Sequence, residues 1–307
     1  MNENISQIVS NNIQWINISK KGRAEINYLK KNFSFDSIDI NECEKDTKHS
    51  NLFMKRDYIY FEILFPIYNR KTKLIEDSEI NFFIKDNVLI TVHDNKIDQL
   101  SGFFNEMHNN VSLKRNNFQD STIKLLSGIL SSLFGSCFPM LNHMDEDISA
   151  LEKEIFTSAQ KTNTEVILRL RWNVVNFRRI IQSYKNIVEK LIENGQDLFS
   201  MSNLKVYYSD LIEKTKDIWT MLENQKESIH ALQETNESLI SYQLNDIMKA
   251  LAIISATMMP PAFIVGLFGV NAKIPFITNP FFFLFIILAC IVLVISFILY
   301  FKHKKWL

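Results

Sequence analysis

The sequence predicts an α+β cytoplasmic domain, then long stalk helices, and finally a C-terminal two-helix transmembrane hairpin. Three observations predict this fold class: short β-rich runs near the N-terminus, a long helical middle, and two apolar runs at the C-terminus. The predicted parts are a cytoplasmic α/β domain (1–119), a cytoplasmic helical bundle and stalk (120–249), a first transmembrane helix (250–270), an outer loop (271–280), a second transmembrane helix (281–301) and a basic cytoplasmic tail (302–307).

Short runs rich in β-branched and aromatic residues predict strands in the first part. The run at Tyr58–Phe65 is expected to form a buried strand that ends at Pro66. Two later runs are separated by Lys85-Asp86-Asn87, which predicts a hairpin-like turn. The remaining ranges are Ile13–Ile18, Ile80–Ile84 and Val88–His93 for strands, and Lys21–Phe33 for an amphipathic helix between strands.

The middle of the chain predicts long helices, because no proline occurs between Pro139 and Pro260. One charged helix is expected to start at Asp145, a second to cover Val166–Glu193, and a third to start near Ser202 and continue into the membrane. Apolar residues recur every three or four positions along the third helix, which predicts a packing seam. The seam consists of Leu204, Tyr208, Leu211, Ile218, Leu222, Ile229, Leu232 and Leu239, and it is interrupted by Thr215, Gln225 and Asn236.

The two C-terminal apolar runs each have about the ~20 residues that cross ~30 Å of hydrocarbon. The loop between them is so short that the second span must return beside the first. The first span is rich in small residues, which let membrane helices approach closely, whereas the second is mostly Phe, Ile, Leu and Val. We therefore expect the second span to face lipid. One hairpin encloses nothing, so several copies around an axis would place the first spans inside.

One face of the third helix stays polar, small or methionine-containing as it enters the membrane. Such a stripe can be a packing face or a pore wall. Polar groups at membrane depth usually face protein or water, which favours a pore. Stepping by threes and fours from Ser241, the stripe consists of Asn245, Met248, Ala252, Ser255, Met259, Ala262 and Gly266.

Basic residues at the two ends of the hairpin predict its orientation. Lys249 precedes the first span, the tail residues Lys302, His303, Lys304 and Lys305 follow the second, and the loop has only Lys273. The positive-inside rule then places both termini in the cytoplasm. The N-terminus lacks the basic and apolar regions of a signal peptide, so none is expected.

The composition argues against several other classes. The formal charge is zero, from 34 basic and 34 acidic residues; four of the lysines and none of the acids lie beyond residue 249, so the part before the hairpin has a net charge of about −4. This is no basic footprint for a nucleic acid. Cys43, Cys137 and Cys290 are isolated, which suits a reducing cytosol and argues against disulfides or a structural zinc site.

The sequence offers few candidates for catalysis or tight metal binding. His93, His143 and His230 are scattered singly, so we expect structural or surface roles for them. No Walker glycine loop, HExxH motif or nucleophile elbow occurs, so we expect no enzyme. A membrane-anchored helical scaffold without transport is an alternative to a pore.

Several motifs together resemble the CorA family of divalent-cation transporters, over almost the whole chain. The family's Gly-Met-Asn mark corresponds here to Gly269-Val270-Asn271, at the outer end of the first span. The segments 245–255 and 260–268 look like the family's pore helix, and Leu89–His93 looks like a strand of its cytoplasmic domain. A short loop, a second span and a basic tail follow the triplet, as the family requires.

The resemblance implies a funnel-shaped homopentamer in which five first spans line the pore and five Asn271 amides ring its outer mouth. Gly269 and Val270 complete that mouth, and Met248, Leu251 and Met259 match positions that form apolar constrictions in the family. An amide oxygen accepts hydrogen bonds from the water around a cation and binds it more weakly than a carboxylate. The implied partners are membrane lipid and divalent cations rather than nucleic acid, with no tightly bound cofactor, in a bacterial inner membrane.

Some details look like the zinc-transporting ZntB branch of this family. Val270 replaces the family's methionine, Ile274-Pro275 follows the triplet, the loop has no acidic residue, and the chain ends in Lys305-Trp306-Leu307. The resemblance thus favours transport of Zn²⁺, with CorA-type transport of magnesium or cobalt as the alternative. Zn²⁺ prefers His and Cys ligands, and none lies near Asn271, so zinc would pass hydrated or with transient oxygen ligands.

Overall fold

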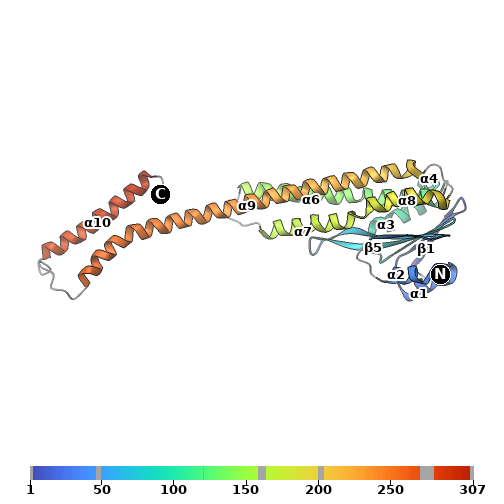
Figure 1. The fold of residues 1–307 in the computed structure, drawn as a ribbon, viewed down its shortest axis with the longest axis horizontal. Coiled ribbons are helices and arrows are strands. Elements are labelled where there is room, and N and C mark those ends of the chain that lie inside the picture. The colour runs from blue at the N-terminus through green and yellow to red at the C-terminus, as the bar shows by residue number, and fades with distance from the viewer. Residues whose placement is uncertain are drawn as a thin grey trace. The chain divides into compact units, whose positions relative to one another are not determined.

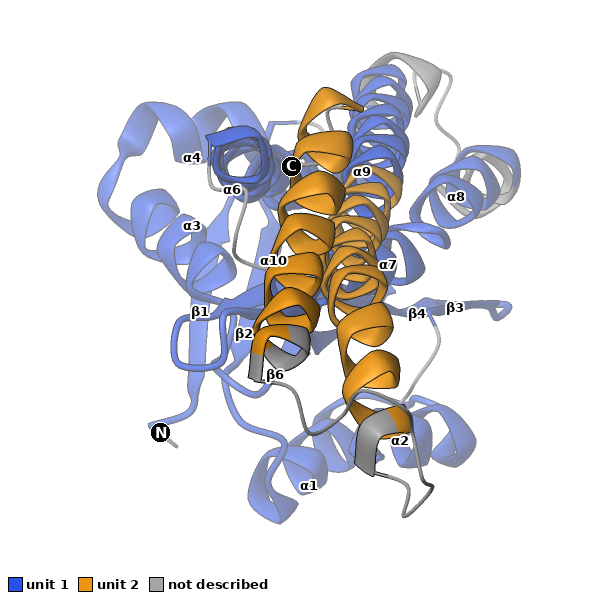
Figure 2. Ribbon diagram, turned by 90° about the vertical axis from the view of Figure 1, so that its left-hand side faces the viewer, with its two compact units in different colours: residues 1–233 blue, residues 234–307 orange. Residues whose placement is uncertain are grey.

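The computed structural model describes residues 3–45, 50–119, 121–157, 164–199, 204–269 and 280–304. Figure 2 shows two compact units, 1–233 and 234–307, whose boundary lies within one long helix. The boundaries of the six predicted parts stay a prediction. The fold class is as expected: an α/β unit, a long helix and a C-terminal apolar helix.

The described residues of the first unit form one six-stranded sheet with the strand order β1-β2-β6-β5-β4-β3. The pair β2–β6 is parallel and all other neighbouring pairs are antiparallel. The strands are β1 (Ile5–Ser10), β2 (Ile13–Ile18), β3 (Asn51–Met54), β4 (Ile59–Asn69), β5 (Leu74–Lys85) and β6 (Val88–His93).

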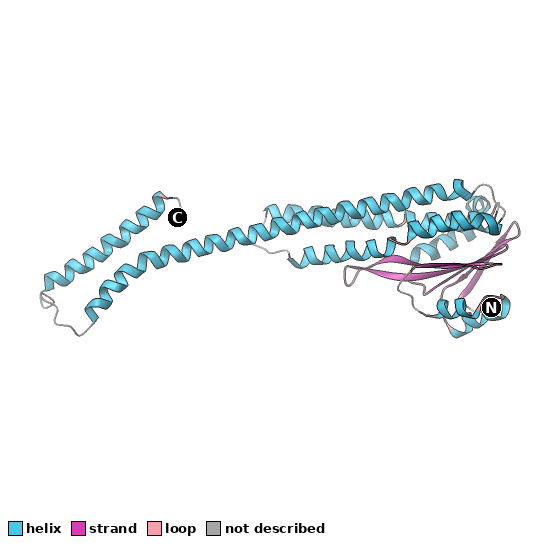
Figure 3. Cartoon of the chain, in the orientation of Figure 1, coloured by secondary structure: helices cyan, strands magenta, loops and turns pink. Residues whose placement is uncertain are grey.

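Helices cover both faces of this sheet (Figures 1 and 3). The helices α1 (Arg23–Asn32) and α2 (Ser37–Glu44) lie on one face, and α3 (Asp98–Asn109) lies on the other. Successive side chains of β2 point to opposite faces of the sheet, so the strand contributes to a buried core on each face. Ile16 joins the buried cluster under α1 and α2, whereas its neighbour Trp15 contacts Phe104 of α3 with ring centroids 4.8 Å apart.

The expected strand Ile13–Ile18 is confirmed as β2. Strand β1 and its tight turn into β2 were missed; in that turn Asn11 and Asn12 both have positive φ (46° and 65°), which is the conformation of a type I′ turn. The short edge strand β3 was missed as well. The turn at Lys85–Asn87 is confirmed, because it joins the antiparallel pair β5–β6 and Asp86 has a φ of 50°.

The expectation that a strand ends at Pro66 is wrong, because β4 continues through this residue to Asn69. The N–H of Leu64 donates to Ser50 Oγ at 3.0 Å, on the side of β4 away from β5. Amide groups two residues apart in a strand point the same way, so the Pro66 nitrogen faces that side too. Pairing with β3 stops at Glu62, so Pro66 lies beside an open edge and removes no ladder hydrogen bond.

The helices that follow are α4 (Val111–Asn117), α5 (Thr122–Gly135), α6 (Cys137–Thr157), α7 (Thr164–Ile181), α8 (Tyr184–Phe199), α9 (Leu204–Gly269) and α10 (Pro280–His303). Two expected boundaries are wrong. Helix α6 starts at Cys137 rather than Asp145, because Pro139 lies in the first turn, where no intrahelical N–H bond is lost. The expected helix Val166–Glu193 is two helices, broken at Gln182–Ser183.

The long helix α9 confirms the expected uninterrupted third helix. Within the first unit its seam residues Tyr208, Leu211, Ile218, Leu222 and Ile229 are buried. The interruptions Thr215 and Gln225 are buried in the same seam, and Gln225 Nε2 donates to the carbonyl of Leu141 at 2.8 Å. A polar side chain with such a partner fits a seam without breaking the helix.

Within the described residues, three helical stretches are long and apolar enough to cross a membrane. Half of the apolar window in Thr122–Thr157 is buried inside the first unit, so packing in the core accounts for its composition. The other two stretches, Tyr208–Leu267 and Leu284–His303, keep most or all of their windows exposed. By length and composition, these two correspond to the predicted transmembrane hairpin.

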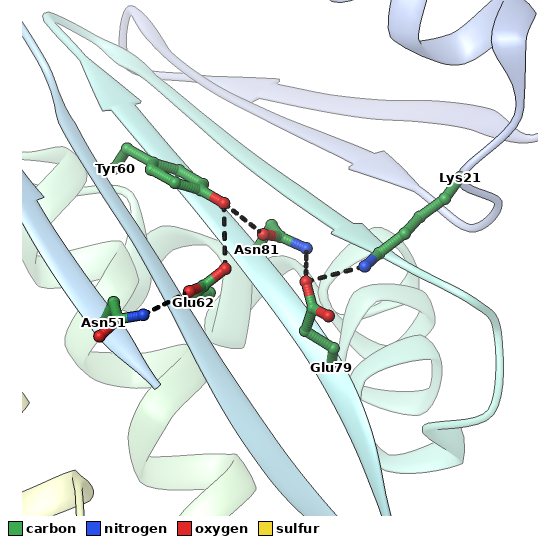
Figure 4. A network of polar contacts seen from close by, with 6 residues as sticks. All are labelled: Lys21, Asn51, Tyr60, Glu62, Glu79 and Asn81. Atoms are coloured by element: carbon green, nitrogen blue, oxygen red, sulfur yellow. Dashed lines mark hydrogen bonds and ion pairs between the residues drawn. The ribbon is translucent and has the colours of Figure 1, made fainter. Parts of the chain in front are cut away.

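A polar network with two buried glutamates lies on the sheet (Figure 4). Lys21 Nζ contacts Glu79 Oε1 at 2.8 Å, and both side chains are almost fully buried. Asn81 Nδ2 donates to the same oxygen at 2.6 Å, and Tyr60 OH lies 2.8 Å from Asn81 Oδ1 and 3.2 Å from Glu62 Oε2. Lys21 therefore supplies the positive charge that faces the Glu79 carboxylate in the core.

We expect Lys21→Met to destabilise the protein strongly. Removing one partner of a buried ion pair leaves the other charge uncompensated, which costs about 3–5 kcal/mol. The measurement is the thermal unfolding midpoint of the full-length protein in detergent. The matched control is Lys45→Met, whose ion pair with Glu42 is exposed and contributes at most about 1 kcal/mol. Equal midpoints for the two variants would contradict the assignment.

Candidate functional site

The candidate site is the part of α9 that belongs to the second unit. Each side chain that the sequence assigned to a pore wall is exposed in the single chain. Met248 and Met259 are 69% and 74% exposed, which is unusual for large apolar side chains. The complete set is Asn245, Met248, Leu251, Ala252, Ser255, Met259, Ala262 and Gly266, and we call it the α9 stripe.

The opposite side of α9 is covered. Ile253 and Thr257 are each only 7% exposed, and Ala256, Pro260 and Ile264 near them are half-buried. At 100° per residue, Ile253 and Thr257 lie roughly 160° around the helix from the stripe. Figure 2 shows α10, the other described helix of this unit, beside α9. The single chain thus buries one side of α9 and leaves the stripe open.

The stripe is neutral and combines small residues with a few large apolar ones. Between Lys249 and the end of α9 the sequence has no charged residue. Ser255 supplies a hydroxyl, and Ala252 and Ala262 supply only methyl groups. Among the described residues, a Cβ added at Gly266 would meet nothing within 4 Å, so packing against them does not explain this glycine. A stripe of this kind suits close contact with other copies, or a water-filled lumen.

Two prolines interrupt the hydrogen-bond ladder of α9 beside the stripe. Helix α9 includes Pro260 and Pro261, which have no N–H to donate to the carbonyls of Ala256 and Thr257. The hydroxyl of Thr257 donates to the carbonyl of Ile253 at 2.7 Å, so it does not satisfy its own carbonyl. Such freed carbonyls are tolerated in membrane helices when neighbouring helices or water satisfy them. The sequence analysis did not identify these two free carbonyls, although the adjacent prolines Pro260 and Pro261 indicate them.

The inner end of the stripe carries charge. Lys249 Nζ lies 3.1 Å from Asp246 Oδ1 and 6.0 Å from the ring centroid of Tyr242. All three side chains are at least partly exposed, so the pair contributes little to stability. Asn245 lies next to this pair and adds a neutral amide at the same depth. The charged pair Asp246–Lys249 lies at the end of the span that is expected to be cytoplasmic.

The predicted outer mouth is mostly outside the described residues. Gly269 is the last residue of α9, and Val270 and Asn271 follow beyond the described part. The same holds for Lys273 and Ile274-Pro275 of the loop. The role of Asn271 as the selector for a hydrated ion stays a prediction.

The buried histidine uses both ring nitrogens within the protein. His93 Nδ1 accepts from the N–H of Asn95 at 3.1 Å, so Nε2 carries the proton and lies 3.2 Å from Asn17 Oδ1. Burial lowers the pKa of His93 to about 4. Thr91 Oγ1 donates to the same Asn17 oxygen at 2.7 Å and accepts from Trp15 Nε1 at 3.1 Å. His93 thus has a structural role, as the sequence suggested.

The other possible metal ligands are dispersed. His143 is exposed and lies 3.6 Å from Glu146 of its own helix. Burial raises the pKa of the Cys43 thiol to about 12 and raises that of Cys137 as well, so both are protonated thiols. Within the described residues, no three His, Cys, Asp or Glu side chains are close enough to hold a metal ion together.

Known proteins share both the sequence pattern and the fold. The family model of the CorA-like Mg²⁺ transporter protein matches residues 10–303. The cobalt/magnesium transport protein CorA of Thermotoga maritima is 21% identical over 295 residues, which cover 95% of this chain and 83% of that protein. The complete structure of the CorA magnesium transporter from Methanocaldococcus jannaschii superposes with a TM-score of 0.82 at 20% identity, covering 100% of this chain and 95% of that one.

A second solved structure resembles the first unit. The cytoplasmic domain of ZntB from Vibrio parahaemolyticus superposes with a TM-score of 0.62 at 12% identity, covering 75% of this chain and 88% of that domain. At this identity the likeness concerns the fold alone. It therefore does not distinguish the ZntB branch from its relatives.

Proposed function

Because the chain belongs to the CorA-like Mg²⁺ transporter family, we propose that it carries divalent metal cations across a membrane through a pore lined by α9. One observation supports this most directly. The α9 stripe is neutral and exposed and includes the small residues Ala252, Ser255, Ala262 and Gly266, while the opposite side of the helix is buried at Ile253 and Thr257. A neutral lining can hydrogen-bond to the water of a hydrated ion and still release it, as conduction requires.

The pore needs several copies of the chain. A single α9 helix offers one wall, so the stripes of several copies must face a common axis. The family resemblance favours five copies, and the small residues Ala252, Ala262 and Gly266 let the helices come close. Facing copies would also cover the apolar groups that are exposed in the single chain, such as Met248 and Met259.

The charges around the hairpin favour one orientation. Lys249 lies just before the span, Lys302 and Lys304 follow the second span, and the sequence between the spans has one lysine. We therefore propose that both termini are cytoplasmic and that the membrane is a bacterial inner membrane. A divalent cation that enters gains about 4.6 kcal/mol per 100 mV of inside-negative potential, so uptake needs no ATP.

Two ions are candidates for transport. The names of relatives such as the Thermotoga maritima protein support magnesium and cobalt. Zinc is supported by Val270 in the triplet and by the loop without acidic residues. The stripe contains no His, Cys, Asp or Glu among the described residues, and an amide ring at Asn271 would accept hydrated Mg²⁺. We therefore place magnesium and cobalt first and zinc second.

A competition experiment distinguishes the two ions. Vesicles with the reconstituted protein are given radioactive zinc and rising magnesium, and uptake of both ions is measured. We expect robust magnesium uptake and block of zinc entry by equimolar magnesium. Zinc entry that persists in a large excess of magnesium would instead assign the chain to zinc. Vesicles in which neither ion nor cobalt enters would contradict transport and favour the scaffold alternative.

A further inference from the structure

A cavity of about 500 Å³ lies in the first unit, where the break between α7 and α8 faces α9. It has no residue in common with the α9 stripe. Its size is within the ~300–1,000 Å³ of typical small-molecule sites. The lining consists of Ile181, Gln182, Lys185, Asn186, Ile212, Thr215, Lys216 and Trp219.

Local structure explains why the space exists. Helix α7 ends at Ile181 and α8 starts at Tyr184, so the helix is interrupted at Gln182 and Ser183 beside α9. On α9, Thr215 occupies a seam position between Leu211 and Ile218, and its side chain is smaller than theirs. The Thr215 hydroxyl donates to the carbonyl of Ile212 at 2.8 Å, so it is satisfied without filling the cavity.

The charge of the lining is positive. Lys185 and Lys216 contribute two ammonium groups, and the lining contains no Asp or Glu. Lys185 has an ion pair with Glu189, but this pair is long (3.7 Å) and exposed, so a stronger anion can displace it. Lys216 has no carboxylate within ion-pair distance among the described residues. Both ammonium groups are therefore available to an anionic ligand.

The indole of Trp219 forms an aromatic wall and is 38% exposed. Its ring is held by Arg178, whose guanidinium carbon lies 4.8 Å from the ring centroid. Arg178 is itself fixed by Glu223, with Nη2 2.6 Å from Oε2, and Glu223 also contacts Lys226 at 2.8 Å. The indole thus has a fixed orientation before any ligand arrives.

We propose that this cavity binds an organic polyanion of nucleotide size, with its phosphates on Lys185 and Lys216 and its planar ring against Trp219. The cations supply charge-assisted hydrogen bonds to phosphate oxygens. The amides of Gln182 and Asn186 supply both donors and acceptors for the polar edge of a base. The proposal is independent of which ion the pore carries, because it uses only residues of the first unit.

The test is calorimetric titration of the full-length protein in detergent with ATP and, separately, with inorganic tripolyphosphate. We expect ATP to bind about tenfold more tightly than tripolyphosphate, because a base stacked on an aromatic side chain contributes to affinity. Lys216→Ala should weaken ATP binding about tenfold, because it removes a charge-assisted bond. The matched control is Lys153→Ala, an exposed lysine of α6 outside the lining, which should leave the affinity unchanged.

Fluorescence gives a second readout. ATP should quench the emission of Trp219, and Trp219→Phe should lose this quenching while retaining calorimetric binding, since phenylalanine keeps a ring at this position. Trp219→Leu should reduce the affinity for ATP to that for tripolyphosphate. Absence of ATP binding to the wild-type protein, equal affinity for the two ligands, or an unchanged affinity in Lys216→Ala would overturn the proposal.

Discussion

Replacing Ala262 by phenylalanine should reduce cation flux by on the order of 100-fold. Ala262 belongs to the exposed stripe of α9, where a single chain places no neighbour over it. If several copies face a common axis, the substitution adds a ring of aromatic side chains to a narrow lumen. An apolar constriction of that kind closes a pore by excluding water. Flux is measured in vesicles loaded with a metal-sensitive dye.

The matched control is Ala289→Phe, because Ala289 is an exposed alanine on the apolar helix α10. If α10 faces lipid, a larger apolar side chain there changes nothing that an ion meets, and flux should stay within about twofold of wild type. Native mass spectrometry of both variants checks that the proposed pentamer persists. Similar losses in both variants would mean that the stripe is a packing face rather than a pore wall.

The periodicity of the sequence predicted the buried seam of α9, and the pore role of the stripe that follows it stays a prediction. Ile218 and Leu222 are buried, as the 3–4 spacing requires, and Ser255 and Ala262 are exposed on the continuation of the helix. The buried side of the span, with Ile253 and Thr257, follows the same helical spacing. The sequence did not identify it as buried, because nearly every residue of a span is apolar whether it faces lipid or protein.

Other boundaries depend on contacts between distant parts of the chain. The break between α7 and α8 contains neither Gly nor Pro. Its reason is tertiary: Tyr184 stacks on Phe134 with centroids 4.6 Å apart, and its hydroxyl donates to the carbonyl of Leu64 at 2.6 Å. Pro66 is similar, since only the short pairing of β3 leaves an open edge beside it. The sequence of a single segment does not contain this information.

The cavity beside this break could not be predicted from the sequence of any one segment either. Thr215 interrupts the seam in the sequence, and the interruption becomes a cavity only because α8 starts at Tyr184. Lys185 and Lys216 are separated by about thirty positions in the sequence, and neither belongs to a known motif. Charge clusters of this kind become visible when two helices are placed side by side.

The second large effect is expected for Asn271→Ala, which should abolish cation uptake while the protein still folds and assembles. Asn271 follows the end of α9 by two residues, at the outer end of the predicted pore helix. In the proposed assembly its amide oxygens accept hydrogen bonds from the water around the ion, and alanine has no such acceptor. Gly269→Leu should have the same effect, because it adds a bulky side chain at the last residue of α9.

A second asparagine of the same loop offers a control for this prediction. Asn279→Ala removes an identical amide eight residues later, next to Pro280, and should leave uptake close to that of wild type. Uptake is compared at equal amounts of assembled protein, so a loss of assembly is not mistaken for a loss of selectivity. Both substitutions replace a neutral amide by a methyl group, so neither changes the net charge of the loop. Wild-type flux from assembled Asn271→Ala protein would place the selective mouth elsewhere on α9. The polar stripe residues Asn245 and Ser255 would then be the next candidates for contact with the hydrated ion.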